Sequence, residues 1–480
     1  MSTPGVYIEE IPTFPPSVAP VETAIPAFIG ITKKTSDAES NTLIDVPKRI
    51  TSLLEFEQIF GRSSNQAFAV DVVQEYSEEP LRLLSTKVTL TGSPPSPPSG
   101  SDLLYYAIQL FYANGGGPCY IVSAASTKFI NAVNTLEEFD EPTIIASPGA
   151  VYEGNYADII NAALKQCNKL QDRVTVIDVP NDKSMTDIDT NFRTPILSDL
   201  SIIKYGAAYY PFLKTSYPFL TNDSSITITS HTVKILDSTG TDVTGTTSVT
   251  IPTSITGGVT LDDTTENIAQ DFNSVYVAVK SYVTQFKVTL PPSSAVAGVY
   301  ARVDNDRGVW KAPANVSISN IESPTIKVTN DFQDGLNIDP NSGKSINAIR
   351  TFTGRGTLVW GARTLAGNDN EWRYVPVRRF FNFAEESIKK ATGRFVFEPN
   401  DKNTWTMVKT MIENFLILQW REGALAGEKP QHAFYVKVGL NQTMTAEDIL
   451  NGFMNVEIGM AVVRPAEFII LKFSHKMQES

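Results

Sequence analysis

The segment Asn341-Ser342-Gly343-Lys344-Ser345 has the residue types with which a phosphate-binding loop ends. In such a loop, backbone N–H groups and a lysine hold the phosphates of a nucleotide. The loop also requires a glycine five positions before Gly343, and position 338 is Ile. The nearest preceding glycine, Gly335, is misplaced. The pattern therefore argues against a nucleotide site in this segment.

Two other short patterns contain groups that could bind ions. Residues 304–306, Asp-Asn-Asp, supply oxygen ligands, but Gly308 and the lack of a glutamate at the twelfth loop position break the EF-hand pattern for calcium. The glycines at 115–117 follow a predicted helix and precede a predicted strand, the reverse of the order that aims a helix N-terminus at a phosphate. We interpret them as a helix C-cap.

The residues offer little for nucleophilic or acid–base chemistry. No G-x-S-x-G nucleophile elbow occurs. Paired acids such as Asp262-Asp263 lie in polar sequence, where a solvated surface is the simpler interpretation. The chain has three histidines, scattered along its length: His231, His432 and His475. A nucleophile–base pair is therefore not expected, and we predict no catalytic residue, no metal and no cofactor.

Composition and charge restrict the partners that the protein can have. The 480 residues include 40 Lys or Arg against 52 Asp or Glu, a net charge of −12. Binding to nucleic acid or to an anionic membrane needs a basic surface, so neither is expected. A hydrophobic fraction of 42% excludes a mostly disordered chain. The two cysteines, Cys119 and Cys167, cannot form a disulfide framework, and we expect them to be buried.

The sequence gives no sign of export or of membrane insertion. Its first residues lack the basic and apolar regions of a signal peptide. No apolar run approaches the ~18 residues needed to span a bilayer. We therefore expect a soluble protein that is made in the cytoplasm.

Residues 1–30 are interpreted as an extended N-terminal arm. Residues 5–11 alternate like a short strand, and five prolines between positions 12 and 26 prevent helix formation. The linker over 12–27 could reach about 50 Å at about 3.3 Å per residue. A frayed terminus is the alternative interpretation.

Residues 101–213 alternate between helical and strand patterns. This alternation predicts a mainly parallel sheet with helices on both faces. The pattern resumes at residue 291, so the α/β core domain is predicted over 31–214 and 291–343. The predicted helices cover 102–114, 127–139, 156–170 and 295–303, and the predicted strands cover 119–122, 143–146, 173–179 and 205–210.

Residues 215–290 differ sharply in composition from the core. They contain 27 Ser or Thr among 76 residues, and three Lys against seven Asp or Glu. Short alternating runs such as 226–229 and 232–236 indicate small antiparallel strands. We interpret the segment as a β-rich module inserted into a surface loop, because such loops tolerate insertions at low cost.

Residues 344–480 are predicted to form a C-terminal α+β domain, which makes the whole chain an α/β (overall α+β) protein. Helices are expected near 382–392 and over 404–422, the second with one apolar face: Val408, Met411, Ile412, Phe415 and Leu418. The chain closes on a segment of high β-propensity, residues 468–473.

An ordered series of segments resembles the contractile tail sheath family, which includes the sheaths of contractile phage tails, tailocins and extracellular contractile injection systems. The series covers most of the chain and is densest near the C-terminus. Residues 31–100 and the 215–290 module match nothing in the family core. The matching segments are 4–10 (PGVYIEE), 27–30 (AFIG), 111–116 (FYANGG), 209–211 (YYP), 291–298 (PPSSAVAG), 307–315 (RGVWKAPAN), 359–365 (VWGARTL), 378–379 (RR), 397–400 (FEPN), 423–425 (GAL) and 464–469 (RPAEFI).

The resemblance implies a structural subunit and not an enzyme. Family members stack as hexameric rings around an inner tube, and contraction drives the tube through a target envelope. The implied partners are copies of this chain, the inner tube protein, baseplate and terminator or cap proteins, and other sheath paralogues. Assembly would take place in the cytoplasm, and the finished particle would be extracellular or virion-like.

The resemblance also implies that terminal strands are exchanged between neighbouring subunits. A strand on an extended arm and an apolar strand at the other terminus are suited to this pairing. The candidate strand contacts are Val6, Tyr7, Ile8, Glu9, Ile11, Phe468, Ile469, Ile470, Leu471, Lys472 and Phe473.

Basic residues concentrate in the domain that the resemblance makes the inner, tube-facing one. Nine Lys or Arg stand against five Asp or Glu between residues 346 and 400. Ion pairs within the subunit are the alternative for each residue, and the aromatic neighbours Phe380, Phe381 and Phe383 suggest partial burial of two of them. The candidate contacts with the tube or with other subunits are Arg363, Arg373, Arg378, Arg379, Lys389 and Lys390.

Two other functions stay open from the residues alone. The Ser/Thr-rich module would suit a surface adhesin or scaffold, which would bind glycan or protein and form no tubes. An α/β hydrolase-like enzyme would require a pocket with perturbed titratable groups. Within the sheath interpretation, a single long chain with its own arm suits a phage or extracellular injection particle better than type VI secretion sheaths, which use two different chains.

Overall fold

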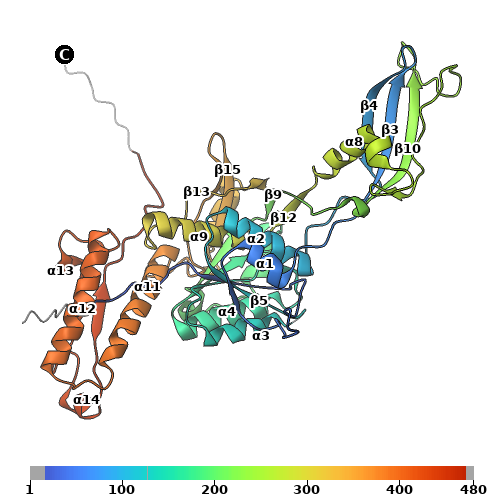
Figure 1. Ribbon diagram of the computed structural model, residues 1–480. Helices are drawn as coiled ribbons and strands as arrows, with labels where there is room; N and C mark the ends of the chain where they lie inside the picture. Colours follow the sequence, from blue (N-terminus) through green and yellow to red (C-terminus); the bar gives the residue numbers. More distant parts are fainter. Residues whose placement is uncertain (1–16, 127, 472–480) are drawn as a thin grey trace, which may run out of the picture.

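A nine-stranded sheet forms the centre of the molecule in the computed structural model, which describes residues 17–126 and 128–471 (Figure 1). The strands lie in the order β13-β16-β15-β8-β7-β6-β1-β5-β2. The strands from β15 to β5 are parallel, and β2, β16 and β13 add to the edges antiparallel. Their bounds are β1 (Pro26–Gly30), β2 (Lys48–Ile50), β5 (Cys119–Ser123), β6 (Ile144–Ala146), β7 (Val174–Asp178), β8 (Gly206–Tyr210), β13 (Val316–Ser317), β15 (Ile346–Phe352) and β16 (Gly356–Val359).

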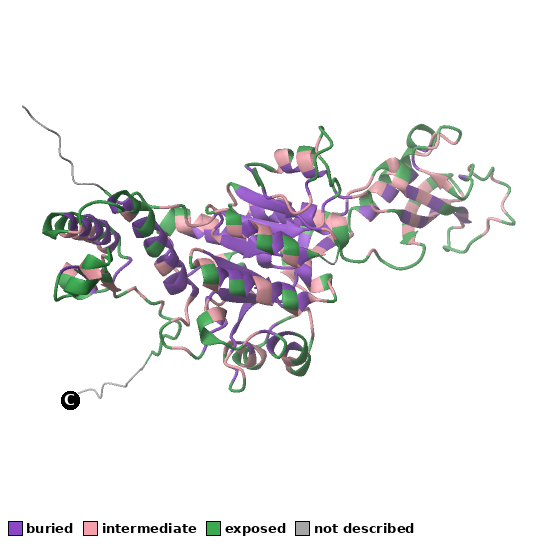
Figure 2. Ribbon diagram, turned by 90° about the horizontal axis from the view of Figure 1, so that it is seen from below, coloured by how far each residue is buried: buried purple, intermediate pink, exposed green. Residues whose placement is uncertain are grey.

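Helices cover both faces of this sheet, which confirms the predicted α/β architecture. Consecutive residues of β1 point to opposite faces: Phe28 packs with α2 (Leu103–Ala113) and α9 (Ser293–Arg307), whereas Ile29 packs with α3 (Phe129–Thr135) and α4 (Tyr156–Leu170). The strands between these layers are the most continuously buried part of the chain (Figure 2). Helix α4 has the predicted bounds, because its ends and its apolar face are encoded locally.

Strand β1 corrects the predicted arm boundary at residue 30. Residues 26–30 are fully buried and pair with β5 on one side and β6 on the other, so they lie at the centre of the sheet. Pro26 begins the strand, where a missing N–H is tolerated, and does not continue the linker. The arm therefore ends near residue 25, with Ile25 bonded through its N–H to Thr143.

Strands β15 and β16 correct the boundary predicted at residue 344. Both belong to the core sheet, where β15 pairs parallel with β8 and antiparallel with β16. The core therefore continues past residue 359. The change of domain comes at α11 (Val375–Thr392), a helix that starts seven residues before the predicted start at 382, with Pro376 in its first turn.

The inserted module is larger than predicted and less purely β. A four-stranded sheet in the order β11-β10-β3-β4 combines β3 (Phe68–Ser77) and β4 (Arg82–Leu90) with β10 (Ile226–Leu236) and β11 (Val259–Thr260). β10 is one long strand parallel to β3, with its register running from Ile226 opposite Phe68 to Leu236 opposite Ser77. The prediction placed residues 68–90 in the core domain, and this pairing shows that they belong to the module's sheet.

Helix α8 (Asn273–Val283) packs against this sheet and was not predicted. Its buried residues Val275, Val279 and Val283 recur every four positions, a helical spacing hidden within Ser/Thr-rich sequence. The module projects from the core on a stem of three strands, β9 (Leu213–Pro218), β12 (Lys287–Leu290) and β14 (Ile321–Pro324) (Figure 1).

The C-terminal domain lies at the opposite end of the core (Figure 1). Helices α11 and α12 (Lys402–Arg421) enclose an apolar cluster with a two-stranded sheet of β17 (Phe434–Lys437) and β18 (Glu457–Met460). Of the predicted apolar face of α12, residues 408, 411, 412 and 415 are buried, but Leu418 is 53% exposed and Leu416 is buried in its place. The remaining helices are α1 (Leu53–Phe60), α5 (Met185–Ile188), α6 (Leu200–Ile203), α7 (Ile268–Asp271), α10 (Asn330–Asn337), α13 (Pro430–Ala433) and α14 (Ala446–Leu450).

We predict that the module can be removed only as two segments together. Replacing 221–284 alone would strip β10 from β3 and expose Val70 and Val72, each worth roughly 1.5–3 kcal/mol of burial. That variant should aggregate. Replacing 70–90 as well, with short Gly/Ser linkers, should give a soluble core, because both cuts fall between hydrogen-bonded neighbours (Thr91 N–H to Ala69 O, 2.8 Å; Phe219 N–H to Phe286 O, 3.4 Å). Circular dichroism and gel filtration measure the outcome, and a soluble monomer from the single replacement would contradict it.

Candidate assembly interfaces

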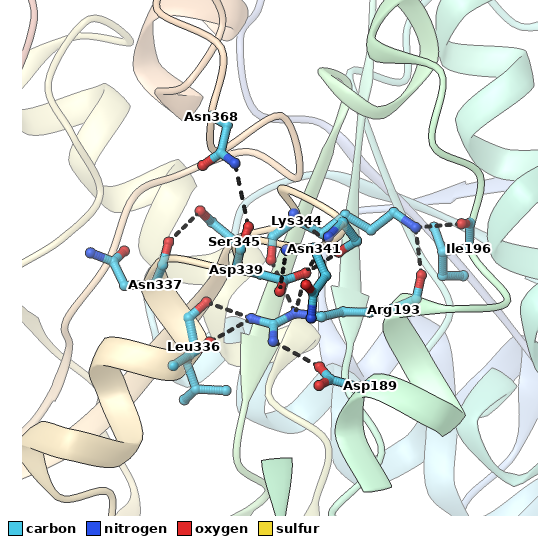
Figure 3. A network of polar contacts seen from close by, with 12 residues as sticks. Asp189, Arg193, Ile196, Leu336, Asn337, Asp339, Asn341, Lys344, Ser345 and Asn368 are labelled. Atoms are coloured by element: carbon cyan, nitrogen blue, oxygen red, sulfur yellow. Dashed lines mark hydrogen bonds and ion pairs between the residues drawn. The ribbon is translucent and has the colours of Figure 1, made fainter. Parts of the chain in front are cut away.

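The phosphate-loop-like lysine is part of the core and has no room for a nucleotide. Lys344 is buried, and its ammonium group donates to the carbonyl oxygens of Arg193 and Ile196, at 2.6 Å in the second case (Figure 3). Burial lowers the pKa of Lys344. The carboxylate of Asp339 accepts the N–H groups of Asn341 and Ser342 and thereby closes the turn. This network joins two distant segments of the chain.

Arg193 completes that network from the other segment. Its guanidinium donates to the carbonyl oxygens of Gly335 and Leu336 at 2.8 and 3.0 Å and pairs with Asp189 at 2.8 Å (Figure 3). These carbonyls belong to the last turn of α10, where backbone acceptors lack partners within the helix. The cluster therefore fixes α10 on the core and is a structural network.

Asp178 is a buried carboxyl group of the core, and it also has a structural partner. It ends β7, is 3% exposed, and accepts both the N–H and the hydroxyl of Ser293 at 2.6 Å at the start of α9. Burial raises its pKa to about 7, while the bonds to Ser293 act against that rise. A carboxyl group enclosed in this way caps a helix and does not reach a substrate.

Neither a cluster of metal ligands nor a membrane-spanning helix occurs in the parts of the chain that the structure describes. Among residues 17–126 and 128–471, no group of three or more His, Cys, Asp or Glu side chains could hold a metal ion. No helix in those ranges is long and apolar enough to cross a membrane. Both cysteines are buried and unpaired by disulfide, as predicted.

Helix α11 connects the C-terminal domain to the core through Arg379. The guanidinium pairs with Asp304 on α9, at 2.9 Å between Nη1 and Oδ1, and also donates to the carbonyl of Thr23 at 2.9 Å. The two charged side chains are only 3% and 5% exposed, and the face of Tyr300 lies 4.5 Å from the guanidinium. Asp304, which looked like a calcium ligand, is therefore one half of a buried ion pair.

Arg378 is held by aromatic rings within the same subunit. Its guanidinium lies 4.3 Å from the ring centre of Trp372 and 4.9 Å from that of Tyr205, a cation–π arrangement. It donates to Asn382 at 2.8 Å and to Glu385 at 3.0 Å. The burial predicted from the aromatic neighbours is confirmed and is nearly complete.

The remaining predicted basic contacts differ in exposure. Arg363 is buried and pairs with Glu467, and Arg373 donates to Gly367 O and to Asn370. Lys390 bridges α11 to Asp140 of the core at 2.7 Å. Among the residues that the structure describes, Lys389 pairs with Glu386 of its own helix alone, at 3.0 Å, and its side chain is 69% exposed. Of the six predicted residues, Lys389 is the one whose charge points most freely away from the subunit.

The described part of the C-terminal tail is apolar and exposed. Phe468, Ile469, Ile470 and Leu471 are 69%, 80%, 81% and 72% exposed, and none of them belongs to a strand within the single chain. The predicted tail contacts Lys472 and Phe473 lie outside the described residues, as do the predicted arm contacts at 6, 7, 8, 9 and 11. Four consecutive exposed apolar residues form a patch of the kind that protein–protein contacts commonly cover.

An apolar groove lies beside the small sheet of the C-terminal domain. It has a volume of about 860 Å³ between α11, α12 and β18, and its floor includes Val456, Ile458 and Met460. Within the described residues β18 pairs only with β17, so its other edge has no strand partner. An open strand edge next to an apolar groove has the geometry needed to accept an added strand.

Phe397 at the rim of this groove was not predicted as a functional residue. Its side chain is fully exposed, and its backbone has φ of +70°, a left-handed conformation that is costly for a residue with a β-carbon. Val396 beside it is 62% exposed. The sequence did contain a signal for an exposed apolar residue at this position. An apolar run, Phe-Val-Phe, comes directly before Glu-Pro-Asn, where the chain must turn.

These features define a class of protein: a structural subunit with a rigid α/β body, an exposed apolar tail and an open sheet edge. Comparison with protein-family models shows a match of residues 367–476 to the phage tail sheath C-terminal domain. Among solved structures, the chain is 30% identical to the helical sheath of the anti-feeding prophage in its contracted state, with a TM-score of 0.62 and coverage of 99% of this chain and 100% of that one. The chain belongs to the contractile tail sheath family.

Other relatives agree with this assignment. The sheath complex of the extracellular contractile injection system PVC, in its contracted state, is 29% identical, with a TM-score of 0.63 and coverage of 99% of this chain and 98% of that one. The tail sheath protein of Burkholderia phage BcepMu is 29% identical over 159 residues, and that of Enterobacteria phage T4 is 25% identical over 130 residues. The latter alignments cover 32% and 26% of this chain, and only 33% and 19% of the phage proteins.

We predict that Arg379→Gln separates the C-terminal domain from the core. Removing one partner of a buried pair leaves Asp304 charged and unpaired, which should cost about 3–5 kcal/mol. Lys409→Gln is the matched control, because Lys409 and Glu413 are 3.8 Å apart and both well exposed, a pair worth about 0–1 kcal/mol. Urea unfolding followed by tryptophan fluorescence compares the two, and equal midpoints would contradict the predicted role of the buried pair.

Proposed function

We propose that this protein assembles with copies of itself into a helical sheath of stacked six-membered rings around an inner tube, and that contraction of the sheath drives the tube through a target envelope. The observation that carries the proposal is the exposed run Phe468 to Leu471 on a chain of sheath fold. Burying such a side chain contributes roughly 1.5–3 kcal/mol, and exposure to water loses most of that free energy. A second subunit supplies the missing cover.

The acceptor for this tail is the open edge of β18 in a neighbouring subunit. Each main-chain hydrogen bond of an added strand contributes about 1 kcal/mol net, and alternate side chains enter the apolar groove beside the edge. Residues 5–11 of the arm are proposed as a second added strand. Val18 is buried in the C-terminal domain, and the N–H of Val21 bonds to Ser387 of α11, so the arm departs from the same domain that holds the acceptor edge.

The proposed mechanism needs no chemical step. In it, subunits move as rigid bodies between two packings while the added strands keep them joined, and the work comes from the new interfaces. The related chains occur in an extracellular injection system, in a baseplate complex and in phage tails. These relatives support a baseplate as a further partner and a finished particle of the extracellular or phage type. A terminator as a partner and assembly in the cytoplasm are proposed from the sequence resemblance alone.

Lys389 is proposed as the tube contact among the basic residues of the C-terminal domain. Arg363, Arg378 and Arg379 each form an ion pair with a carboxylate of the same subunit. Lys390 likewise pairs with Asp140. Lys389 extends from the last turn of α11, where the helix dipole favours a cation. Its exposed ammonium group suits an acidic surface on the tube.

We predict that a proline in the tail abolishes assembly without affecting the subunit. Ile470→Pro removes a backbone donor and breaks the added strand, whereas Ile470→Val keeps both the donor and the β-propensity. Both variants should melt like the parent, because Ile470 is 81% exposed. Electron microscopy should find ordered tubes with Ile470→Val and none with Ile470→Pro. Normal tubes from the proline variant would exclude strand addition by the tail.

We predict that Lys389→Gln weakens docking to the tube more than Lys390→Gln does, because the charge of Lys390 is already paired with Asp140 and Glu386. Glutamine is preferred to glutamate because a new acid would face Glu385 and Glu386 in the last turns of α11. Loss of an exposed contact costs about 1 kcal/mol or less for each subunit, summed over many copies. Co-sedimentation of sheath with tube at increasing salt measures docking, and a thermal melt measures the subunit. Wild-type co-sedimentation of Lys389→Gln at low salt would contradict the contact.

A further inference from the structure

A single side chain makes the polar contacts at the root of the C-terminal tail, among the described residues. The N–H of Val463 bonds to the carbonyl of Ala424 at 3.1 Å, the last backbone bond before the tail. Between residues 464 and 471, every hydrogen bond and ion pair with other described residues is made by the carboxylate of Glu467. The direction in which the tail leaves the subunit therefore depends on that carboxylate.

The carboxylate of Glu467 is bound from three segments of the core. Arg363 donates through Nε to Oε1 and Oε2 at 2.9 and 3.1 Å, and through Nη2 to Oε2 at 2.7 Å. Tyr374 donates its hydroxyl to Oε2 at 3.1 Å, and Asn337 donates Nδ2 to Oε1 at 3.2 Å. A bidentate arginine fixes the plane of the carboxylate as well as its position.

Arg363 is itself rigidly seated on the sheet. Its N–H donates to the side-chain oxygen of Asn347 at 2.7 Å, and its carbonyl accepts from the same amide at 2.8 Å. Asn347 lies in β15 of the central sheet. The side chain of Arg363 is 5% exposed and that of Glu467 is 22% exposed, so water competes weakly for the pair. Burial raises the pKa of Glu467, but the bonds and charge of Arg363 outweigh it and the net pKa is lowered.

We infer that Glu467 is a positioning residue: it clamps the tail to the subunit's own core, so that the exchanged strand starts at a fixed point. The inference rests on the proposed strand exchange. Phe468 follows the clamp directly. Without the clamp, the last anchor is Val463, and the additional four residues would let the start of the strand wander by up to about 13 Å. A longer flexible segment between the last anchor and the strand lowers the effective concentration of the strand at its acceptor.

The clamp itself is tested on the unassembled subunit. Spin labels at Asp331→Cys on α10 and Ile469→Cys on the tail report their distance by double electron–electron resonance, because both sites are exposed and the native cysteines are buried. Glu467→Gln should broaden the distance distribution at least about twofold relative to the subunit that carries only the labels. Its melting temperature should fall, because the buried Arg363 loses its charged partner, but the subunit should stay folded at the temperature of the measurement. Glu371→Gln, an exposed carboxylate on the neighbouring loop, is the matched control and should leave the distance distribution narrow. Equal widths for Glu467→Gln and Glu371→Gln would overturn the inference.

Assembly provides the second test, with a variant that keeps the clamp intact. Inserting Gly-Ser-Gly between Glu467 and Phe468 preserves every contact of Glu467 but releases the strand from it. This insertion and Glu467→Gln should each raise the protein concentration needed for tube formation by about tenfold. Tube formation at the wild-type concentration by both would overturn the inference. If the parent forms no tubes, the strand exchange is wrong, and the distance measurement alone still decides whether the clamp exists.

Discussion

The arrangement of the subunit depends on one buried ion pair, that of Arg379 with Asp304. It joins α11 of the C-terminal domain to α9 of the core, and the same guanidinium holds the backbone of Thr23 just before β1. Charges this deeply buried are tolerated only when each has its partner. The pair therefore sets the position of the C-terminal domain, the course of the arm and the starting point of the central strand at once.

Away from this junction, several apolar side chains and one strand edge of the described residues have no partner within the subunit. The tail at 468–471 and the side chain of Phe397 are exposed, and β18 has a free edge among the described residues. In a protein that acted alone these would favour aggregation. On a subunit whose two domains are firmly joined, the same features present defined contact points at fixed separations, which is what a helical assembly requires.

Local signals predicted most of the core, and non-local pairing accounts for what was missed. The bounds of α4 follow from its own apolar spacing, and the parallel sheet follows from the alternation of helices and strands. β3 pairs with β10, which lies about 160 residues further along the chain, and nothing in the sequence of either segment indicates that the two strands are partners. β1 was read as linker because prolines precede it, although its burial comes from strands that lie far along the chain.

For the candidate interface, too, local signals were predictive and partners distant in sequence were missed. The neighbours Phe380, Phe381 and Phe383 correctly indicated that Arg378 is buried, although the rings closest to its guanidinium are those of Trp372 and Tyr205, at 4.3 and 4.9 Å, against 5.7 Å for Phe381. The partners of Arg363 and Arg379 are Glu467 and Asp304, which lie 104 and 75 residues away. A count of charges in a segment cannot reveal such partners. The basic stretch therefore suggested an outward-facing surface, whereas folding buries three of its nine cations, Arg363, Arg378 and Arg379.

This use of positive charge inside the subunit determines what can hold many subunits together. The chain carries a net charge of −12, and its buried cations Arg363, Arg378 and Arg379 are already paired within the subunit. Neighbouring copies therefore repel one another, and salt screens that repulsion. The attraction that overcomes it has to come from contacts that salt does not weaken. Apolar side chains entering a groove and main-chain hydrogen bonds along a strand edge are contacts of this type. In the proposed mechanism, salt should therefore favour self-assembly through the tail, because it screens the repulsion between copies, and should weaken docking to a charged tube, because it screens the attraction.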